Sequence, residues 1–412
     1  MKPFNHLSSA VFPLLLIVGC TPVESRDFFP DDGLDDAEEL QAEIDATAAM
    51  GGGTVALDNG TYNLSRPVYL RDNVVLQGNG PKTILTNEGL NGKSTWGGVT
   101  LFAGNLAAAS FTYNGGRGHR GYRVQRTGAA SVRFADCTAP TTKPVAGDVV
   151  WLASEKGEEG RGGWHRPYSG EMHLVTSISD CTITFADPVE IANTHLIDLH
   201  WPETDRVRYS DVERNRPIKF AAVRNLQLRS SASQAMLTTG CYKCVFDGLT
   251  IGRSRRLLAV QGMRNGIYRN ISGMFEERGI EFAMFATNNV VENISGRYEP
   301  RIGYPLRPVV RLGESSRDNV IRNVQFNLLN AADVANPIRF DESSNNILED
   351  IVLTVNDDAR PPKFIYRPEG AKRGQSLTLP AGTNLRGVKQ CSRIHEAPKG
   401  SPTSEPLSCE EF

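Results

Sequence analysis

Three charged residues recur at matching places in consecutive stretches of the sequence and could together handle an acidic ligand. Glu281, Arg311 and Arg339 precede the anchor position of a sequence repeat by 12, 12 and 11 residues. Each has apolar residues on both sides. Since side chains alternate along a strand, those neighbours point inward and the charged side chains point outward. Stacked strands lie ~4.8 Å apart, so the sequence predicts a column of one carboxylate and two guanidiniums on an exposed wall.

Two reactions on a polysaccharide would use such a column. β-Elimination on a uronate polymer needs a cation that neutralises the sugar carboxylate, a base that removes the adjacent proton and an acid for the leaving oxygen. Arginines suit the first task because a guanidinium binds a carboxylate through two parallel hydrogen bonds. Hydrolysis would instead pair Glu281 with Asp341, which follows Arg339 by two residues on the same face. Their predicted separation leaves room for a water molecule and fits an inverting pair.

A purely structural role is the competing interpretation of this column. Glu281 and Arg311 would then form a solvated ion pair between neighbouring strands, worth ~0.2–1 kcal/mol. The matching positions of the earlier coils are predicted to be Leu258 and Met236, which confines the charge to three coils. The basic run of Arg253, Arg255 and Arg256 is interpreted as solvated surface.

Two loops carry residues suited to holding a sugar. The loop Gly157 to Glu171 is long, polar and rich in glycine, and the loop Arg297 to Pro308 holds the additional residues of one long repeat. Long irregular loops often carry function. The predicted substrate-binding residues of these loops, and of the matching turn one coil earlier, are Trp164, His165, Tyr168, Arg301, Tyr304 and Arg278.

Six segments in the second half of the chain share one pattern of strand-forming residues. Their third residues, which serve as anchors, are Asn225, Gly248, Asn270, Asn293, Asn323 and Asp350. Spacings of 23, 22, 23, 30 and 27 residues predict one strand-built coil per repeat. Gly266, Asn289, Asn319 and Asn346 each lie four residues before one of the later anchors. Glycine and asparagine tolerate the left-handed backbone of a tight turn. Asn289, Asn319 and Asn346 are therefore expected to form an architectural ladder of hydrogen bonds.

A helix followed by short strands opens this coiled region. Asp35 is predicted to cap the helix, with Glu38 completing a capping box, and an apolar face follows at helical spacing (Ala37, Leu40, Ile44 and Ala48). The stretch DDAEELQAEIDATAAMGGGTVALDNGTYNLSRPVYLRDNVVLQGNG resembles the opening of the pectate-lyase-like β-helix superfamily, over about residues 31–85. In that group such a helix plugs the first coil, which would otherwise expose apolar surface.

The resemblance implies a protein that acts on polysaccharide, with an arginine or lysine as the base of a lyase and calcium as a possible cofactor. No metal ligands are assigned in this sequence. The strand following Arg278, Gly279-Ile280-Glu281-Phe282, faintly resembles a polygalacturonase strand, but that family's paired aspartates and GHG motif are missing. A β-eliminating lyase is therefore the first hypothesis, a β-helix glycoside hydrolase the second, and a glycan-binding surface protein without catalysis the third.

The N-terminus predicts export and a lipid anchor. An apolar run ends in Ile17-Val-Gly-Cys20, which resembles the bacterial lipobox and makes Cys20 the lipidation site. We expect a cell-envelope protein held in a membrane by this lipid, on the outer membrane rather than the inner. A formal net charge of −2 gives no argument for a nucleic-acid partner. The expected partner is a polysaccharide substrate, and the expected state is a monomer.

Six further cysteines in an exported chain indicate disulfides. Local pairing would join Cys137 to Cys181, Cys241 to Cys244 and Cys391 to Cys409, although fifteen connectivities are possible. The predicted fold class is all-β: a right-handed parallel β-helix with an N-terminal capping helix and an inserted small β subdomain. The predicted divisions are a signal peptide (1–19), a linker (20–30), the cap and first coils (31–99), the insert (100–210), regular coils (211–360) and a C-terminal tail (361–412).

Overall fold

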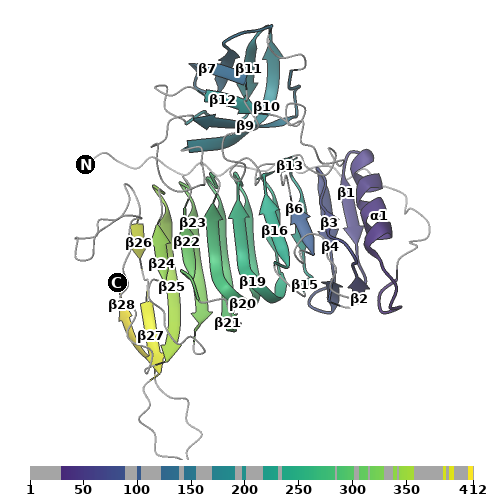
Figure 1. The fold of residues 1–412 in the computed structure, drawn as a ribbon, viewed down its shortest axis with the longest axis vertical. Helices are drawn as coiled ribbons and strands as arrows, with labels where there is room; N and C mark the ends of the chain where they lie inside the picture. Colours follow the sequence, from purple (N-terminus) through teal and green to yellow (C-terminus); the bar gives the residue numbers. More distant parts are fainter. Residues whose placement is uncertain are drawn as a thin grey trace, which may run out of the picture.

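The chain folds into a right-handed parallel β-helix with one capping helix and an inserted β-barrel, and the predicted fold class is confirmed (Figure 1). The structure, a computed structural model, describes residues 29–88, 100–103, 122–138, 143–154, 169–190, 197–200, 217–230, 234–283, 285–300, 306–313, 316–328, 337–340, 343–356, 384–386, 389–393 and 407–411. Within these ranges no helix is long and apolar enough to cross a membrane.

Helix α1 (Ala37–Ala49) covers the first coil. Leu40 and Ile44 are fully buried against the core of the β-helix, as the apolar spacing predicts. The predicted capping by Asp35 is confirmed, because its carboxylate accepts from the backbone N–H of Ala37 at 3.1 Å, although the helix boundary places Asp36 at the N-cap and that side chain makes no capping hydrogen bond. The contact predicted for Glu38 stays a prediction. The Asp36 carboxylate instead accepts from the backbone N–H of Asn63, and Asp35 accepts from that of Ser65. Both aspartates thereby tie the helix to strand β2.

Three parallel sheets form the walls of the β-helix, and successive coils add one strand to each. The first sheet contains β1 (Gly53–Ala56), β4 (Val74–Gln77), β14 (Ala222–Arg224), β18 (Val245–Asp247), the first parts of β20 (Ile267–Ala283), β21 (Val290–Tyr298), β23 (Val320–Asn327) and β25 (Ile347–Asn356), and β26 (Asn384–Arg386). The second contains β2 (Gly60–Asn63), β5 (Thr83–Thr86), β15 (Gln227–Arg229), the first part of β19 (Thr250–Gln261), the later parts of β20, β21, β23 and β25, and β27 (Lys389–Arg393). The third contains β3 (Val68–Tyr69), β6 (Leu101–Ala103), β16 (Met236–Thr239), the ends of β19 and β20, β22 (Val310–Leu312) and β24 (Ile338–Phe340).

A single left-handed residue makes the bend between the first and second sheets in the six coils of the sequence repeat. All six anchors of the sequence repeat have φ between 50° and 66°. Five of the six are asparagine or aspartate and one is glycine, the residues that adopt this conformation at least cost. In the exposed part of this bend, Asn323 donates to Asn293 and Asn293 donates to Asn270, at 2.7 and 3.1 Å. The repeat found in the sequence is thus the signature of this bend.

A second ladder of asparagines holds the turn between the third and first sheets, as predicted. The side-chain amide of Asn289 donates to Asn319 and that of Asn319 to Asn346, both at 2.9 Å, and all three residues are fully buried. Each carboxamide oxygen also accepts a backbone N–H one coil earlier. The left-handed residues of this turn lie one position before those predicted, at Lys243, Asn265, Asn288, Asp318 and Asn345.

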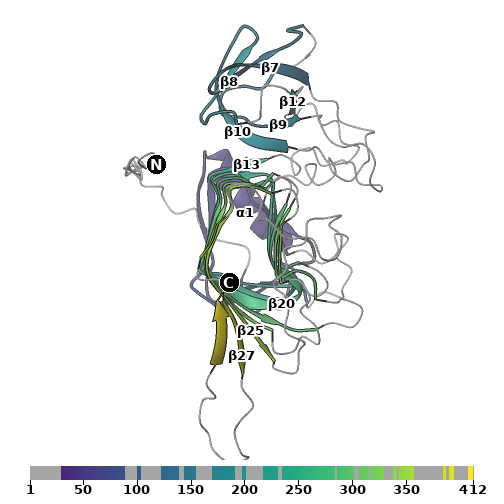
Figure 2. The same ribbon diagram turned by 90° about the vertical axis from the view of Figure 1, so that its left-hand side faces the viewer.

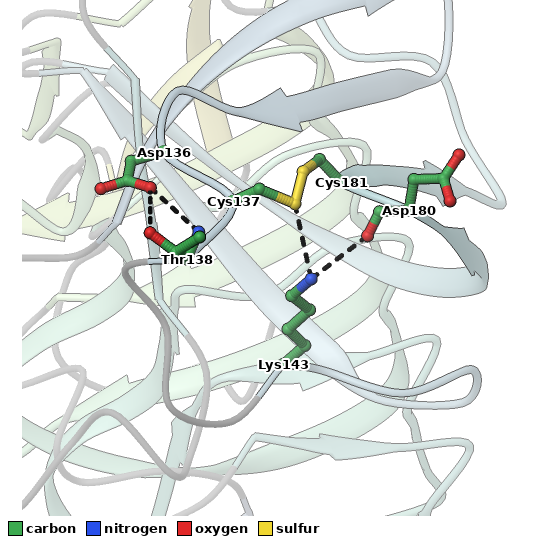
Figure 3. The surroundings of a disulfide bond; sticks show 6 residues. All are labelled: Asp136, Cys137, Thr138, Lys143, Asp180 and Cys181. Atoms are coloured by element: carbon green, nitrogen blue, oxygen red, sulfur yellow. Dashed lines mark hydrogen bonds between the residues drawn. A yellow bond between two sulfur atoms is a disulfide. The ribbon is translucent and has the colours of Figure 1, made fainter.

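The inserted subdomain is a closed six-stranded barrel that lies beyond the edge of the β-helix carrying β13 (Ile218–Lys219) and β17 (Cys241–Tyr242) (Figures 1 and 2). Its strands are β7 (Tyr122–Gly128), β8 (Ser131–Phe134), β9 (Val149–Ser154), β10 (Ser169–Ser179), β11 (Thr182–Phe185) and β12 (Ile197–His200). The predicted disulfide between Cys137 and Cys181 is confirmed (Figure 3). Lys143 donates to the carbonyl of Asp180 beside it, at 3.2 Å.

Ion pairs fix the barrel to the β-helix. Glu171 of β10, which has no exposed surface, binds Arg264 at 3.2 Å and Arg317 at 2.8 Å, both from the ladder turn. His173 lies 3.3 Å from Glu171 and stacks on Phe185, and burial lowers the pKa of His173, so the ring is neutral at pH 7. Glu171 and His173 therefore have a structural place at the joint between barrel and coils.

The remaining cysteines lie in the coils. The predicted disulfide between Cys241 and Cys244 is confirmed and is fully buried in the core. Strands β26 and β27 continue the first and second sheets after β25, in a stretch that the sequence analysis assigned to a tail. In β28 (Leu407–Glu411), which pairs antiparallel with β27, Cys409 is opposite Cys391. Their side chains lie outside the described set, so that disulfide stays a prediction.

The buried ladder predicts a measurable difference between two asparagines of the same coil. Asn319→Ala removes a carboxamide that accepts two hydrogen bonds from Asn289 and donates to Ala286 and Asn346. The free energy of unfolding in urea is expected to fall by about 2–4 kcal/mol, because buried partners lose their bonds. The control, Asn323→Gly, keeps the left-handed bend. This variant should change the free energy of unfolding by less than about 1 kcal/mol. Equal losses in the two variants would contradict an architectural role specific to the buried ladder.

Candidate functional site

The charged column predicted from the sequence is present on the third sheet. Glu281 of β20 is in register with Arg311 of β22, and Arg311 is in register with Arg339 of β24. The residues on either side of the column are buried: Ile280, Phe282, Val310, Leu312, Ile338 and Phe340. Strand alternation therefore places the three charged side chains on the outer face, in vertical succession.

Glu281 is buried, whereas the sequence predicted a carboxylate on an exposed wall. Its side chain is only 2% exposed, because guanidiniums from three strand segments close over the carboxylate. Arg256 and Arg311 each lie 2.8 Å from a carboxylate oxygen, and Arg278 donates to the oxygen that Arg311 also binds. The interpretation of Glu281 and Arg311 as a solvated pair is therefore wrong.

Arg256 is a member of the site that the sequence analysis missed. A register shift in β19 between Ser254 and Arg256 turns the basic run toward the acidic run of β20. Arg253 then contacts Glu276 at 2.5 Å, Arg255 contacts Glu277, and Arg256 contacts Glu281. Ala259, and not the predicted Leu258, stands in register with Glu281, because the turn after β20, from Ala283 to Thr287, is one residue longer than the turn after β19, from Gln261 to Arg264. Counting residues from the anchors cannot detect such an irregularity.

Glu277 is the second buried carboxylate and makes the site larger than the predicted column. It is 1% exposed and is bound by Arg255 and, at 3.0 Å, by Arg307, whose side chain is half exposed. We call the group around the two carboxylates the arginine cluster: Arg255, Arg256, Arg278, Arg307 and Arg311 with Glu277 and Glu281. Among the described residues this cluster holds five guanidiniums and two carboxylates, so positive charge prevails.

The electrostatics of the cluster fix the protonation state of Glu281. Burial alone would raise the pKa of this carboxyl group, but Arg256, Arg278 and Arg311 hold it below the ordinary value. Burial, together with the neighbouring Arg256 and Arg311, lowers the pKa of Arg278 to about 10 against the attraction of Glu281. Glu281 is therefore a permanent anion at neutral pH, which makes it a poor proton donor.

Several predicted site residues lie outside the described part of the chain. Arg278 is in the cluster, and Arg339 lies one coil beyond Arg311 with its side chain partly exposed. The predicted residues that fall in undescribed segments are Trp164, His165, Tyr168, Arg301, Tyr304, Asp341 and Cys20. The segment 301–305 joins two described stretches at Pro300 and Leu306, directly before Arg307 of the cluster.

The arginine cluster does not suit calcium. Calcium takes six to eight oxygen ligands, several of them carboxylates. Both carboxylates of the cluster are instead bound by guanidiniums. In the described residues no three side chains of histidine, cysteine, aspartate or glutamate come together as a metal site. The donor set thus favours an anionic ligand over a cation.

The comparisons with known proteins concern the fold. No protein-family model matches the sequence, and no curated protein matches it, so the pectate-lyase-like resemblance stays a prediction. Among solved structures the chain is similar to the tailspike protein gp49 from Pseudomonas phage LKA1, with 14% identity over 77% of this chain and 57% of that chain and a TM-score of 0.42. It therefore spans little more than half the length of that tailspike.

Two further tailspikes resemble the chain. The tailspike of E. coli bacteriophage HK620, in complex with a pentasaccharide, is 11% identical over 81% of this chain and 49% of that chain, with a TM-score of 0.37. The gp54 tailspike of Acinetobacter baumannii bacteriophage AP22, in complex with a capsular saccharide, is 10% identical over 86% and 66%, with a TM-score of 0.32. The fold and the site together define a parallel β-helix with arginines gathered on its third sheet.

The ion pairs of Glu281 predict a strong effect on stability. Glu281→Gln leaves three arginines around a neutral amide, and the free energy of unfolding at pH 7 is expected to fall by about 3–5 kcal/mol. Because the folded-state pKa of Glu281 is lowered, its contribution is complete above the ordinary value of 4.5 and is lost as pH falls through the folded-state pKa. Urea unfolding from pH 7 to pH 3 measures both effects.

The control for that experiment is Glu292→Gln in the first sheet. Glu292 pairs with the exposed Arg322, so its loss should cost no more than about 1 kcal/mol. A gap between wild type and Glu281→Gln that stays constant down to pH 3, or that matches the Glu292→Gln gap, is incompatible with a buried, arginine-held carboxylate.

Proposed function

We propose that this protein binds an acidic, uronate-containing polysaccharide along the third sheet and cleaves it by β-elimination. The observation that carries the proposal is the arginine cluster, in which two buried carboxylates bind five guanidiniums, the half-exposed Arg307 among them. Guanidiniums positioned in advance bind sugar carboxylates without a large cost in side-chain ordering. Two of the tailspike structures hold a bound saccharide, which supports a saccharide as the ligand.

Arg307, Arg311 and Arg339 are the proposed contacts to sugar carboxylates. Arg311 and Arg339 stand on consecutive strands of one sheet, ~4.8 Å apart, and Arg307 precedes the same strand as Arg311. In β-elimination a cation at the uronate carboxylate stabilises the charge that develops when the neighbouring C–H proton leaves. The C–O bond to the next sugar then breaks, and its electron pair leaves with an oxygen that takes up a proton.

Arg278 is the proposed base for this reaction. Its pKa of about 10 makes deprotonation at pH 7 cost about 4 kcal/mol, less than for an ordinary arginine. The resemblance to β-helix lyases implies a base of this type. The proposed proton donor for the leaving oxygen is Tyr304 or His165, one titratable residue from each of the two predicted loops. Glu281 is not proposed for it, since its carboxylate stays ionised.

The ion pairs of Glu277 and Glu281 have different consequences for the hydrolase and the glycan-binding hypotheses. A hydrolase that uses Glu281 as its general acid is disfavoured, because such an acid needs a raised pKa and Glu281 has a lowered one. Glycan binding without cleavage is the second candidate function. It is favoured by the observation that Glu277 and Glu281, the carboxylates of the cluster, are both engaged by arginines.

Arg311→Ala tests the proposed function. With polygalacturonate and alginate as substrates, we expect wild type to generate unsaturated uronates, seen as a rise in ultraviolet absorbance. The variant should lose at least about tenfold in kcat/KM, which corresponds to one bidentate arginine contact of about 1.4 kcal/mol. Arg322→Ala, an exposed arginine of the first sheet, is the control and should keep the wild-type rate.

Three results would separate the candidate functions. New reducing ends without unsaturated products would indicate the hydrolase. Binding that Arg311→Ala weakens, without any product, would indicate the glycan-binding protein. Neither binding nor cleavage of any acidic polysaccharide by wild type would remove the proposal altogether.

We further propose that Cys20 carries a lipid that anchors the protein in the cell envelope. The lipobox-like sequence before Cys20 supports this proposal. Incorporation of labelled palmitate into wild type but not into Cys20→Ala is the expected result, and equal labelling of both would contradict it.

A further inference from the structure

A groove on the second sheet forms a cavity separate from the arginine cluster. Its volume is about 540 Å³, within the range of sites that bind small molecules. It is lined by Gly273, Ser295, Gly296, Arg297, Gln325, Phe326, Asn327, Val352 and Thr354, which come from β20, β21, β23 and β25. Figure 2 shows β20 and β25 of this sheet on the side of the β-helix farthest from the barrel.

The packing of one aromatic ring shapes this groove. Gly273, Gly296 and Phe326 occupy the same register position in three consecutive coils. A Cβ atom added at Gly296 would come within 2.8 Å of the Phe326 ring, and one at Gly273 within 2.1 Å of the Ile251 carbonyl. The core beneath the row therefore leaves no room for a side chain at Gly273 and Gly296, whereas the Phe326 side chain of the same row fills that core. One row of side chains stands on each side of this middle row.

The two flanking rows are polar and nearly neutral. One contains Ser295, Gln325 and Val352, and the other contains Arg297, Asn327 and Thr354, each in register across three coils. Amide and hydroxyl groups both donate and accept hydrogen bonds, as sugar hydroxyls do. The single charged residue, Arg297, is paired with Glu299 at 2.7 Å. The lining thus differs in kind from the arginine cluster.

We propose that this groove binds a neutral oligosaccharide, at a site distinct from the acidic-polymer site of the third sheet. Polar rows repeat once per coil, ~4.8 Å apart, a distance comparable to one sugar residue of an extended glycan. The rows supply hydroxyl and amide partners to successive sugars. A neutral segment of the same polysaccharide, or a separate neutral glycan, is the ligand class.

Calorimetric titration of the full chain with cellohexaose, chitohexaose and hexagalacturonate tests the proposal. We expect one of the two neutral hexasaccharides to bind, and Gln325→Trp, which fills the groove, to weaken that binding by at least about tenfold. The matched control is Gln125→Trp, an exposed glutamine on β7 of the barrel, which should leave the affinity unchanged. Unchanged thermal unfolding of both variants shows that they are folded.

The outcome is independent of the proposed function on the third sheet. Arg311→Ala should weaken hexagalacturonate and spare the neutral ligand, whereas Gln325→Trp should do the reverse. The groove proposal is overturned if neither neutral hexasaccharide binds, if Gln325→Trp leaves the neutral affinity unchanged, or if Gln325→Trp abolishes hexagalacturonate binding instead.

Discussion

The vertical register of the coils is the constraint on which every other feature depends. Side chains alternate along a strand, so a slip of one residue between coils would send Arg311 into the core and an apolar neighbour outward.

The register is fixed at two corners of each coil. At one corner a left-handed anchor residue makes the bend, and at the other the buried ladder of Asn289, Asn319 and Asn346 joins consecutive turns through carboxamide and backbone hydrogen bonds. Three coils of quite different length, from 22 to 30 residues, therefore still present their third-sheet strands in step.

The β-helix uses stacked charges in two different ways. On the first sheet the outward row alternates in sign along the stack: Arg224, Asp247, Arg269, Glu292, Arg322 and Glu349. These pairs are partly solvated, and each contributes little to stability. In the arginine cluster, as far as the described residues show it, five arginines surround two carboxylates. Burying Glu277 and Glu281 costs desolvation that ion pairing only partly offsets, so the arrangement is a poor device for stability alone. Its consequence is an array of guanidiniums held in place by ion pairs, which is the feature on which the proposed binding of a polyanion rests.

Much of the fold could be predicted from the sequence, because its signals are local. The anchors that make the repeat are the residues with positive φ, and the asparagines four residues earlier form the ladder. The order of Glu281, Arg311 and Arg339 followed from the same count.

Counting residues could not reveal the features that depend on irregular strand register or on the burial of side chains. The shift in β19 that brings Arg256 to Glu281 leaves no mark on the repeat, and the burial of Glu281 arises from long arginine side chains of other coils. The role of Arg307 was hidden for the same reason, since its partner Glu277 lies on the preceding coil.

The central claim is that the arginines of the third sheet are the place where an acidic glycan binds. A crystal structure of the protein with a bound uronate hexasaccharide tests it most directly. The account predicts sugar carboxylates within hydrogen-bonding distance of the Arg307, Arg311 and Arg339 guanidiniums, with Glu281 still held by its three arginines. A hexasaccharide bound on the first sheet, on the barrel or in the groove of the second sheet, with the arginine cluster untouched, would contradict it.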